Sequence, residues 1–187
     1  MRRTFGVLAL ACALIAAVAV ASAGAAGKTA VIKTKSFDTF VPNTANPPNL
    51  LDINHLQWTP GIITVHSGEA VKLINSDNLG DPHVLVIALK KDMPRTSTQI
   101  ENIFTNKVLR EVAPKLLINP ANPNQGFKAY QANAGPNGLN QEGDALVITP
   151  GGPHKTASWF VSAKAGTTLY YFCAVHPWMQ GEIKVVK

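Results

Sequence analysis

Three side chains that bind soft metal ions follow one another near the end of the chain, at Cys173, His176 and Met179. Two residues separate each from the next, and the segment lies between two runs rich in β-forming residues. A loop that joins two neighbouring strands can fold all three side chains onto one point. A thiolate, an imidazole and a weakly binding thioether together favour copper over zinc, calcium or magnesium. The segment therefore predicts a copper site.

A trigonal copper site with a long axial thioether needs a second imidazole. The best candidate is His83, because it opens an apolar, buried strand directly after a polar loop ending in Asp81 and Pro82. The remaining histidines lie in an irregular segment, at a hairpin end and in a Gly-Pro turn, and we interpret them as solvated loop residues: His55, His66 and His154. The predicted copper ligands are therefore His83, Cys173, His176 and Met179.

The N-terminus has the order of a secretory signal. Arg2 and Arg3 precede an uncharged apolar run, and small residues follow with cleavage options after Ala23 or Ala25. We predict a signal peptide over residues 1–25 and an exported protein, on the periplasmic or extracellular face of the membrane. The alternative is an uncleaved N-terminal anchor, which would be the chain's only contact with a membrane.

Cysteine usage supports a metal role. Cys12 belongs to the predicted signal, so the mature chain keeps a single cysteine, Cys173. An unpaired thiol is unusual in an exported protein, because oxidising compartments favour disulfides. Such a thiol is buried and inert, pairs between chains, or binds a metal. Free cysteine and methionine are ordinary core residues singly, but a chance origin for the whole spaced set is improbable.

The charge pattern argues against some partners. Without Arg2 and Arg3 the net charge falls from +6 to +4, from 15 basic and 11 acidic residues. These basic residues are scattered, with no run longer than Lys90-Lys91. We therefore expect neither nucleic acid nor anionic lipid as the main partner, and we expect a monomer.

Period-two apolar patterns indicate a β protein. We expect an all-β Greek-key β-sandwich, antiparallel or mixed, formed by one domain over residues 26–187. The expected strands cover residues 30–37, 61–66, 70–75, 83–89, 145–148, 156–161, 167–172 and 181–186. A turn at 67–69 is expected to join the strands at 61–66 and 70–75 as a hairpin.

Residues from about 90 to 143 form an insertion of different character. Ser97 or Thr98 is expected to cap a helix that runs to Leu116, with Pro114 disturbing its last turn. Residues 119–140 are dense in Asn, Gly, Pro and Gln, which indicates a long ordered loop. The insertion shapes partner choice, covers the site or extends the core.

Together these segments resemble the cupredoxin family, in particular its amicyanin- and plastocyanin-like small blue copper proteins. Residues 58–77 are similar to the family's entry hairpin, and the C-x-x-H-x-x-M spacing is similar to amicyanin's short ligand loop. The resemblance covers about 58–89 and 145–187, close to half the mature chain. It implies a type 1 copper ion bound by His83, Cys173, His176 and Met179. The chain departs from the family at Val84, where an asparagine usually ties the two ligand loops together.

The expected function is a one-electron carrier rather than an enzyme. All ligand positions are occupied by protein groups, which suits outer-sphere electron transfer, and the resemblance implies partner docking near His176, Pro177 and Trp178. The main alternative is a periplasmic copper carrier or resistance protein that binds and releases copper. A catalytic cupredoxin would need paired H-x-H motifs, which the sequence lacks. A metal-free interaction domain is the remaining alternative.

Overall fold

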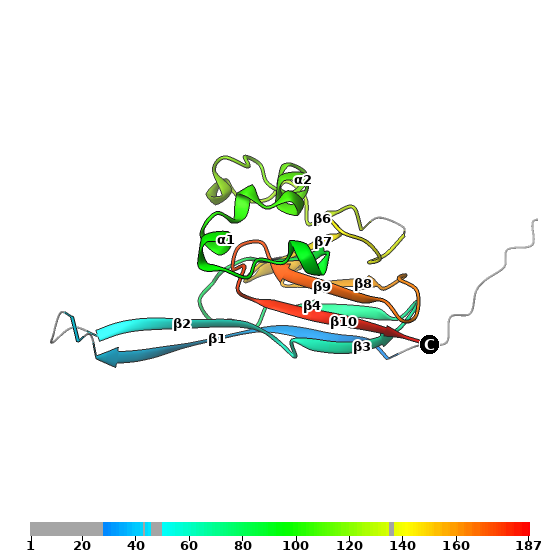
Figure 1. Ribbon diagram of the computed structural model, residues 1–187, viewed down its shortest axis with the longest axis horizontal. Helices are drawn as coiled ribbons and strands as arrows, with labels where there is room; N and C mark the ends of the chain where they lie inside the picture. Colours follow the sequence, from blue (N-terminus) through cyan, green and yellow to red (C-terminus); the bar gives the residue numbers. More distant parts are fainter. Residues whose placement is uncertain (1–27, 43, 46–49, 135–136) are drawn as a thin grey trace, which may run out of the picture.

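Two β-sheets pack face to face, and a helical segment covers the outer face of one of them (Figure 1). The computed structural model describes residues 28–42, 44–45, 50–134 and 137–187, so the expected signal peptide lies outside the described residues. The four-stranded sheet contains, in spatial order, β2 (Leu50–Thr59), β1 (Ala30–Pro42), β4 (Ala70–Ile74) and β8 (Thr156–Phe160). The six-stranded sheet contains β3 (Ile62–His66), β10 (Gln180–Val186), β9 (Thr168–Cys173), β5 (His83–Ala88), β7 (Ala145–Ile148) and β6 (Gln131–Ala132).

The predicted β-sandwich is confirmed, and its sheets are mixed. β1 runs parallel to β4 and β3 runs parallel to β10, whereas the other pairs are antiparallel. The chain crosses repeatedly from one sheet to the other, as in Greek-key sandwiches. Strands distant in sequence therefore become neighbours, and β5 lies between β9 and β7.

The expected hairpin of residues 61–66 and 70–75 is wrong. β3 belongs to the six-stranded sheet, whereas β4 belongs to the four-stranded sheet, so the two strands share no ladder. Both strands alternate buried and more exposed positions, with Ile63 and Val65 in one and Val71 and Leu73 in the other. These side chains meet in one core from opposite sheets. The alternating pattern of the two strands is therefore compatible with a crossing between sheets as well as with a hairpin.

β5 is buried along its whole length because both of its faces are covered. Leu85 and Ile87 point into the core between the sheets. Val84 and Val86 point to the other side, where they pack with Leu109 of α2 (Lys107–Leu116) and other insertion residues. The insertion therefore extends the core by adding a third layer, one of the three roles that the sequence left open.

The insertion begins differently from the prediction. Its first helix, α1 (Ser97–Glu101), is capped by Thr96, which forms a reciprocal capping box with Gln99, and neither Ser97 nor Thr98 is the cap. A second helix starts separately at α2, whose N-cap side chain is Asn106. Pro114 lies inside α2 without ending it, although the helix stops two residues later. The short 3₁₀ turns are η1 (Lys90–Asp92), η2 (Ile103–Thr105), η3 (Pro123–Gln125) and η4 (Gly152–His154).

A long two-stranded ribbon extends beyond the rest of the sandwich (Figure 1). The first strand, expected to stop at residue 37, continues to Pro42 and pairs with β2, which the sequence did not indicate. Phe37 and Phe40 are exposed on this ribbon, and His55 stacks on Phe37. The apolar residues of β2 alternate in two short runs, Leu51 and Ile53 and then Leu56 and Trp58, which are out of phase with each other and so give no continuous strand pattern. Among the described residues, no helix is both long and apolar enough to span a bilayer.

Candidate metal centre

Two antiparallel neighbours bring the first pair of predicted ligands together. His83 is the first residue of β5, and Cys173 is the last residue of β9. Leu85 pairs with Cys173 in this ladder, so the start of one strand meets the end of the other. Both ligand side chains are fully buried, and the backbone N–H of Val84 lies 3.4 Å from Sγ of Cys173. That contact ties the two ligand strands together without the asparagine that the family usually has.

The segment between β9 and β10 folds back on itself. The N–H of Cys173 donates to the carbonyl of Met179 at 2.9 Å, and the N–H of Met179 donates to the carbonyl of His176 at 2.8 Å. The indole N–H of Trp58, from β2, also donates to the Met179 carbonyl at 3.2 Å. These bonds form a closed loop that returns His176 to the ends of β5 and β9, with Met179 buried at its base.

The three strongest donor atoms form a nearly regular triangle. Sγ of Cys173 lies 3.8 Å from Nδ1 of His83 and 4.0 Å from Nδ1 of His176, and the two nitrogens are 3.3 Å apart. A triangle with these sides has a circumscribed radius of about 2.2 Å, which lies between metal–imidazole bonds of about 2.0–2.1 Å and metal–thiolate bonds of about 2.3 Å. One ion in this plane would therefore reach all three atoms at bonding distance. The residues fit a single type 1 copper ion, whose basal ligands are two histidines and one cysteine.

Carboxylates contact the outer nitrogens of both imidazoles. Nε2 of His83 is hydrogen-bonded to Oδ2 of Asp77, whose side chain is fully buried. Nε2 of His176 lies 3.5 Å from Oδ2 of Asp81, whose side chain is 44 % exposed. Donation of the outer N–H of His83 to Asp77 leaves the Nδ1 lone pair of that ring free for a metal, which is the common arrangement around histidine ligands.

Burial sets the protonation of the metal-free ligands. It raises the pKa of the Cys173 thiol to about 11, and backbone hydrogen bonds only partly oppose this rise. Burial also lowers the pKa of His83, against the opposing hydrogen bond to Asp77. The pKa of His176 is lowered by burial and by the nearby His83, against the opposing charge of Asp81. Both imidazoles are therefore neutral near pH 7 and only the thiol must lose a proton to bind metal.

This protonation predicts how metal affinity depends on pH. The thiol is protonated up to a pKa of about 11, so copper binding releases one proton and the association constant should rise about tenfold per pH unit between pH 7 and pH 9. The histidines add no further dependence in this range, because their pKa values lie below the ordinary value of 6.5. Competition with a chelator of known pH dependence measures this slope. A flat profile would contradict a buried thiol as the ligand.

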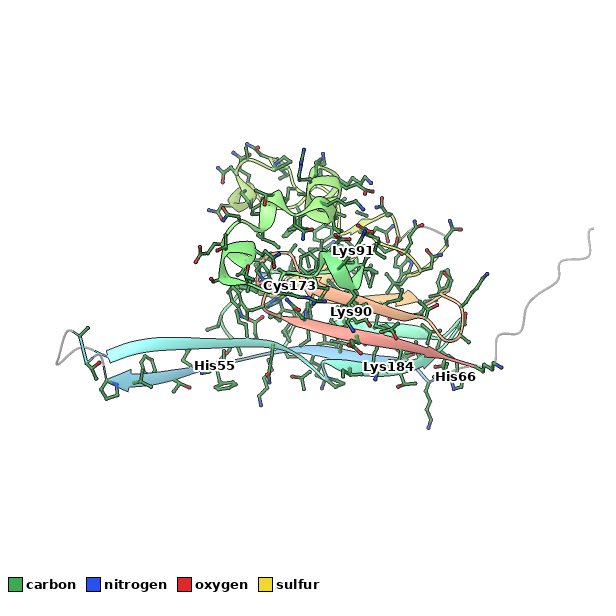
Figure 2. All side chains as sticks on the ribbon, viewed as in Figure 1. His55, His66, Lys90, Lys91, Cys173 and Lys184 are labelled. Atoms are coloured by element: carbon green, nitrogen blue, oxygen red, sulfur yellow. The ribbon has the colours of Figure 1, made fainter. Side chains whose placement is uncertain are left out.

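The other histidines lie away from this centre. His55 is on the ribbon and His66 is at the far end of β3, whereas Cys173 lies beneath the insertion (Figure 2). His154 stacks on Tyr130 with ring centroids 3.4 Å apart. Among the described residues, the one group of metal-binding side chains that meets is His83, Cys173 and His176. The structure therefore brings the predicted His83 together with Cys173 and His176, whereas placing His55 in an irregular segment is wrong because it lies in β2.

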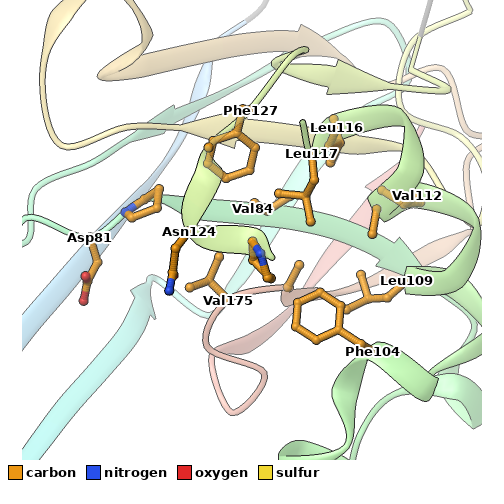
Figure 3. A pocket seen from close by; sticks show the side chains of 15 residues that line it. Asp81, Val84, Phe104, Leu109, Val112, Leu116, Leu117, Asn124, Phe127 and Val175 are labelled. Carbon is orange, nitrogen blue, oxygen red and sulfur yellow. The ribbon is translucent and has the colours of Figure 1, made fainter. Parts of the chain in front are cut away.

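An apolar pocket of about 330 Å³ lies beside the centre, between the insertion and the ligand strands (Figure 3). Phe104 and Leu109 line one side of it, and Val84 and Val175 line the other. Val84 directly follows one ligand and Val175 lies between two others, so the insertion contributes a wall close to the metal centre. A hydrogen bond also joins the insertion to β10, because the side chain of Gln180 donates to the carbonyl of Pro94 at 2.6 Å.

Sequence reasoning missed the residues that support the ligands from behind. Asp77 is the main one, and buried Thr34 and Asn75 hold the loop that carries it. Asp77 lies in a polar loop six residues before His83, and no local pattern distinguishes it from an ordinary turn residue. Thr34 lies 43 residues from Asp77, so only the folded sheet brings them together.

No protein-family model and no curated protein matches the sequence. Solved structures that match the chain include a reduced auracyanin from Roseiflexus castenholzii, at 18 % identity over 70 % of this chain and 88 % of that one, with a TM-score of 0.37. They also include a purple cupredoxin from Nitrosopumilus maritimus, at 12 % identity over 83 % and 98 %, with a TM-score of 0.37. Plastocyanin from Dryopteris crassirhizoma matches at 16 % identity over 83 % and 99 %, with a TM-score of 0.38.

The architecture is a β-sandwich of two mixed sheets with a small helical insertion, as the sequence patterns predicted. The similarity to the solved structures is low in identity and in TM-score, so it carries no residue-level information. The assignment of the metal centre rests on the donor atoms of His83, Cys173 and His176.

Proposed function

We propose that this chain is an exported, mononuclear type 1 copper protein that carries single electrons between redox partners. The observation that carries the proposal is the buried triangle of Nδ1 of His83, Sγ of Cys173 and Nδ1 of His176. Two imidazoles and one thiolate, with a weak and long axial methionine, are the ligand set of blue-copper electron-transfer sites.

Met179 is the proposed axial ligand. Its side chain is almost completely buried, and its backbone is held on both sides by the bonds to Cys173 and His176. A thioether binds copper weakly along the axis, and the strength of that contact tunes the reduction potential. With Met179 in place every ligand comes from the protein and no position is open to a substrate, which supports a carrier rather than an enzyme.

When bound, copper supplies the one-electron couple between Cu(II) and Cu(I). The protein's part is to hold the two imidazoles and the thiolate in one arrangement for both oxidation states, which the ladder between β5 and β9 favours. The apolar surroundings exclude water from the site, because His83, Cys173 and Met179 are at most 1 % exposed. Little rearrangement is then needed when an electron arrives or leaves.

His176 is the proposed point of electron entry and exit. Its side chain is 11 % exposed, which makes it the ligand nearest to solvent among the three that meet. Trp178 lies edge-on to it with ring centroids 5.4 Å apart, and both Trp178 and Val175 are exposed. We propose that a redox partner docks on this apolar patch. Pro177, expected in the same patch, is buried, so its part is to stiffen the loop.

Export rests on the sequence, because the signal at residues 1–25 lies outside the described residues. The basic, apolar and small-residue order supports cleavage and release into the periplasm or to the extracellular face. The single cysteine of the mature chain is unusual for such a compartment, and binding to a metal would account for it, since a thiol held by a metal is protected from forming disulfides.

The alternative function, copper carriage by binding and release, is less well supported. A carrier transfers its ion by ligand exchange, which needs ligands that an incoming group can reach. Here His83 and Cys173 are fully buried, and the side chain of His176 is only 11 % exposed. Slow release of copper is the expected consequence of this burial.

A copper titration followed by voltammetry tests the proposed function. One equivalent of Cu(II) should give an intense blue thiolate-to-copper band that ascorbate bleaches and that returns on reoxidation. Voltammetry should show a reversible one-electron couple, and a competing chelator should remove copper only slowly. A colourless complex would overturn the electron-transfer role, and rapid exchange without a reversible couple would favour the carrier.

The same titration on Met179→Leu tests the axial position. Leucine keeps most of the volume but removes the thioether, so the blue band should persist while the potential rises, because Cu(II) loses a donor. Met93→Leu is the matched control, since Met93 is also buried but lies in the core beneath the insertion. Equal potentials for both variants would exclude Met179 as a ligand.

A further inference from the structure

A buried carboxylate lies directly behind the metal centre. The side chain of Asp77 is fully buried, and its Oδ2 accepts a hydrogen bond from Nε2 of His83. The other nitrogen of the same ring, Nδ1, faces Sγ of Cys173 and Nδ1 of His176. Asp77 and the metal centre therefore lie on opposite sides of one imidazole.

Asp77 has no freedom to turn away from this ring. Its second oxygen, Oδ1, accepts hydrogen bonds from the backbone N–H groups of Leu79 at 3.1 Å and Gly80 at 3.3 Å. Both carboxylate oxygens are thus satisfied, as a buried carboxylate requires. The surrounding donors therefore hold both oxygens of the Asp77 carboxylate in one orientation.

Strand β1 holds the loop that carries Asp77. Oγ1 of Thr34 accepts from the backbone N–H groups of Ser76 at 2.8 Å and Asp77 at 3.0 Å. The same hydroxyl donates to the side chain of Asn75, which in turn donates to the carbonyl of Asp81 at 2.8 Å. Thr34 and Asn75 are themselves buried, so the loop is fixed at both ends before any metal binds.

We propose that Asp77 is a positioning residue of the copper centre that also lowers its reduction potential. By accepting a hydrogen bond from Nε2–H of His83, it keeps the Nδ1 lone pair directed at the ion. Its negative charge lies in a dry environment, where it stabilises Cu(II) more than Cu(I) because the attraction increases with the charge of the ion. This inference deepens the proposed function and rests on it.

A second carboxylate provides a matched control. Oδ2 of Asp81 lies 3.5 Å from Nε2 of His176, so it also faces the outer nitrogen of a ligand imidazole. Unlike Asp77, however, its side chain is 44 % exposed. Water and salt screen such a charge, so its removal should change the centre much less.

The experiment compares Asp77→Asn with Asp81→Asn in the full chain, using copper alone as the ligand. Asparagine retains an oxygen that can accept the hydrogen bond from Nε2–H of His83, but it lacks the negative charge of aspartate. Asp77→Asn should keep the blue band and weaken Cu(II) binding by about 10–100-fold, the range for partners of metal ligands. If the affinity for Cu(I) falls by a factor that is ten times smaller than the factor for Cu(II), the reduction potential rises by about 59 mV. Asp81→Asn should change either affinity by less than about threefold.

Equal affinities and potentials for Asp77→Asn and wild type, or equal shifts for both variants, would overturn the inference. NMR of histidine ¹⁵N in the metal-free wild type supplies a test that needs no variant, and His83 should be the Nε2–H tautomer. The Nδ1–H tautomer would overturn the positioning role even if copper binds. A wild type that gives no blue copper complex, yet shows the expected tautomer, would overturn the proposed function and with it the effect on the potential, but not the hydrogen bond by which Asp77 orients His83.

Discussion

Replacing Cys173 with serine is expected to abolish the blue absorption band and to weaken Cu(II) binding by more than about 100-fold, beyond the loss caused by outer partners of ligands. The band requires a copper–thiolate bond, and a serine hydroxyl does not ionise near neutral pH. Sγ of Cys173 is also one corner of the triangle that defines the site, so its loss leaves two imidazoles without a third strong donor. Absorption spectra during Cu(II) titration measure both effects.

Cys12→Ser is the matched control in the full-length chain, because it removes the only other cysteine. This variant should keep both the band and the affinity. Circular dichroism and the urea midpoint of the metal-free Cys173→Ser protein show whether it still folds. A folded Cys173→Ser protein with an unchanged copper complex would contradict the assignment of the metal centre, since no other cysteine lies among the described residues.

Gly181→Ala is expected to destabilise the protein by about 3 kcal/mol or more, near the upper end of the cost of overpacking a core. An added Cβ would lie 2.2 Å from the carbonyl oxygen of Gly61 and 2.4 Å from the ring and hydroxyl of Tyr171. That oxygen also accepts the N–H of Glu182 at 2.8 Å, so the backbone cannot move away without breaking the pairing of β3 with β10. Because Gly181 lies two residues after Met179, the ligand loop should also shift.

The control for this variant is Gly151→Ala, where an added Cβ meets nothing within 4 Å and the backbone is extended. Its free energy of unfolding should change by less than about 0.5 kcal/mol. Urea unfolding of the metal-free proteins compares the two, and the copper spectrum reports on the loop. Equal stabilities would show that β3, β9 and β10 do not approach as closely at Gly181 as the structure indicates.

The sequence was most informative where local chemistry and burial act together. Cys173, His176 and Met179 were recognisable because their spacing is local and their donor types are rare in combination. His83 could be chosen because an all-apolar run such as β5 indicates a strand covered on both faces. The sandwich was predictable for a similar reason, since most of its strands carry a pattern set by the core they face.

The errors arose where the apolar pattern of the sequence is interrupted or where several partners are equally compatible with it. β2 was missed because its two alternating runs, Leu51 and Ile53 and then Leu56 and Trp58, are out of phase, and β3 was paired with β4 because a short turn joins them. Choosing between a hairpin and a crossing to the opposite sheet depends on which strands are already neighbours. The sequence of one turn does not contain that information.

The sequence by itself predicted the donor set, because ligand chemistry belongs to individual side chains and three of the predicted ligands are close along the chain. Only the tertiary structure decided the geometry of the site and its outer partners. The 3.3–4.0 Å triangle depends on the ladder that joins β5 to β9, and the bond from Thr34 to the Asp77 loop spans 43 residues. Contacts of that range depend on the whole packed sandwich, because each strand is held in register by neighbours distant in the chain.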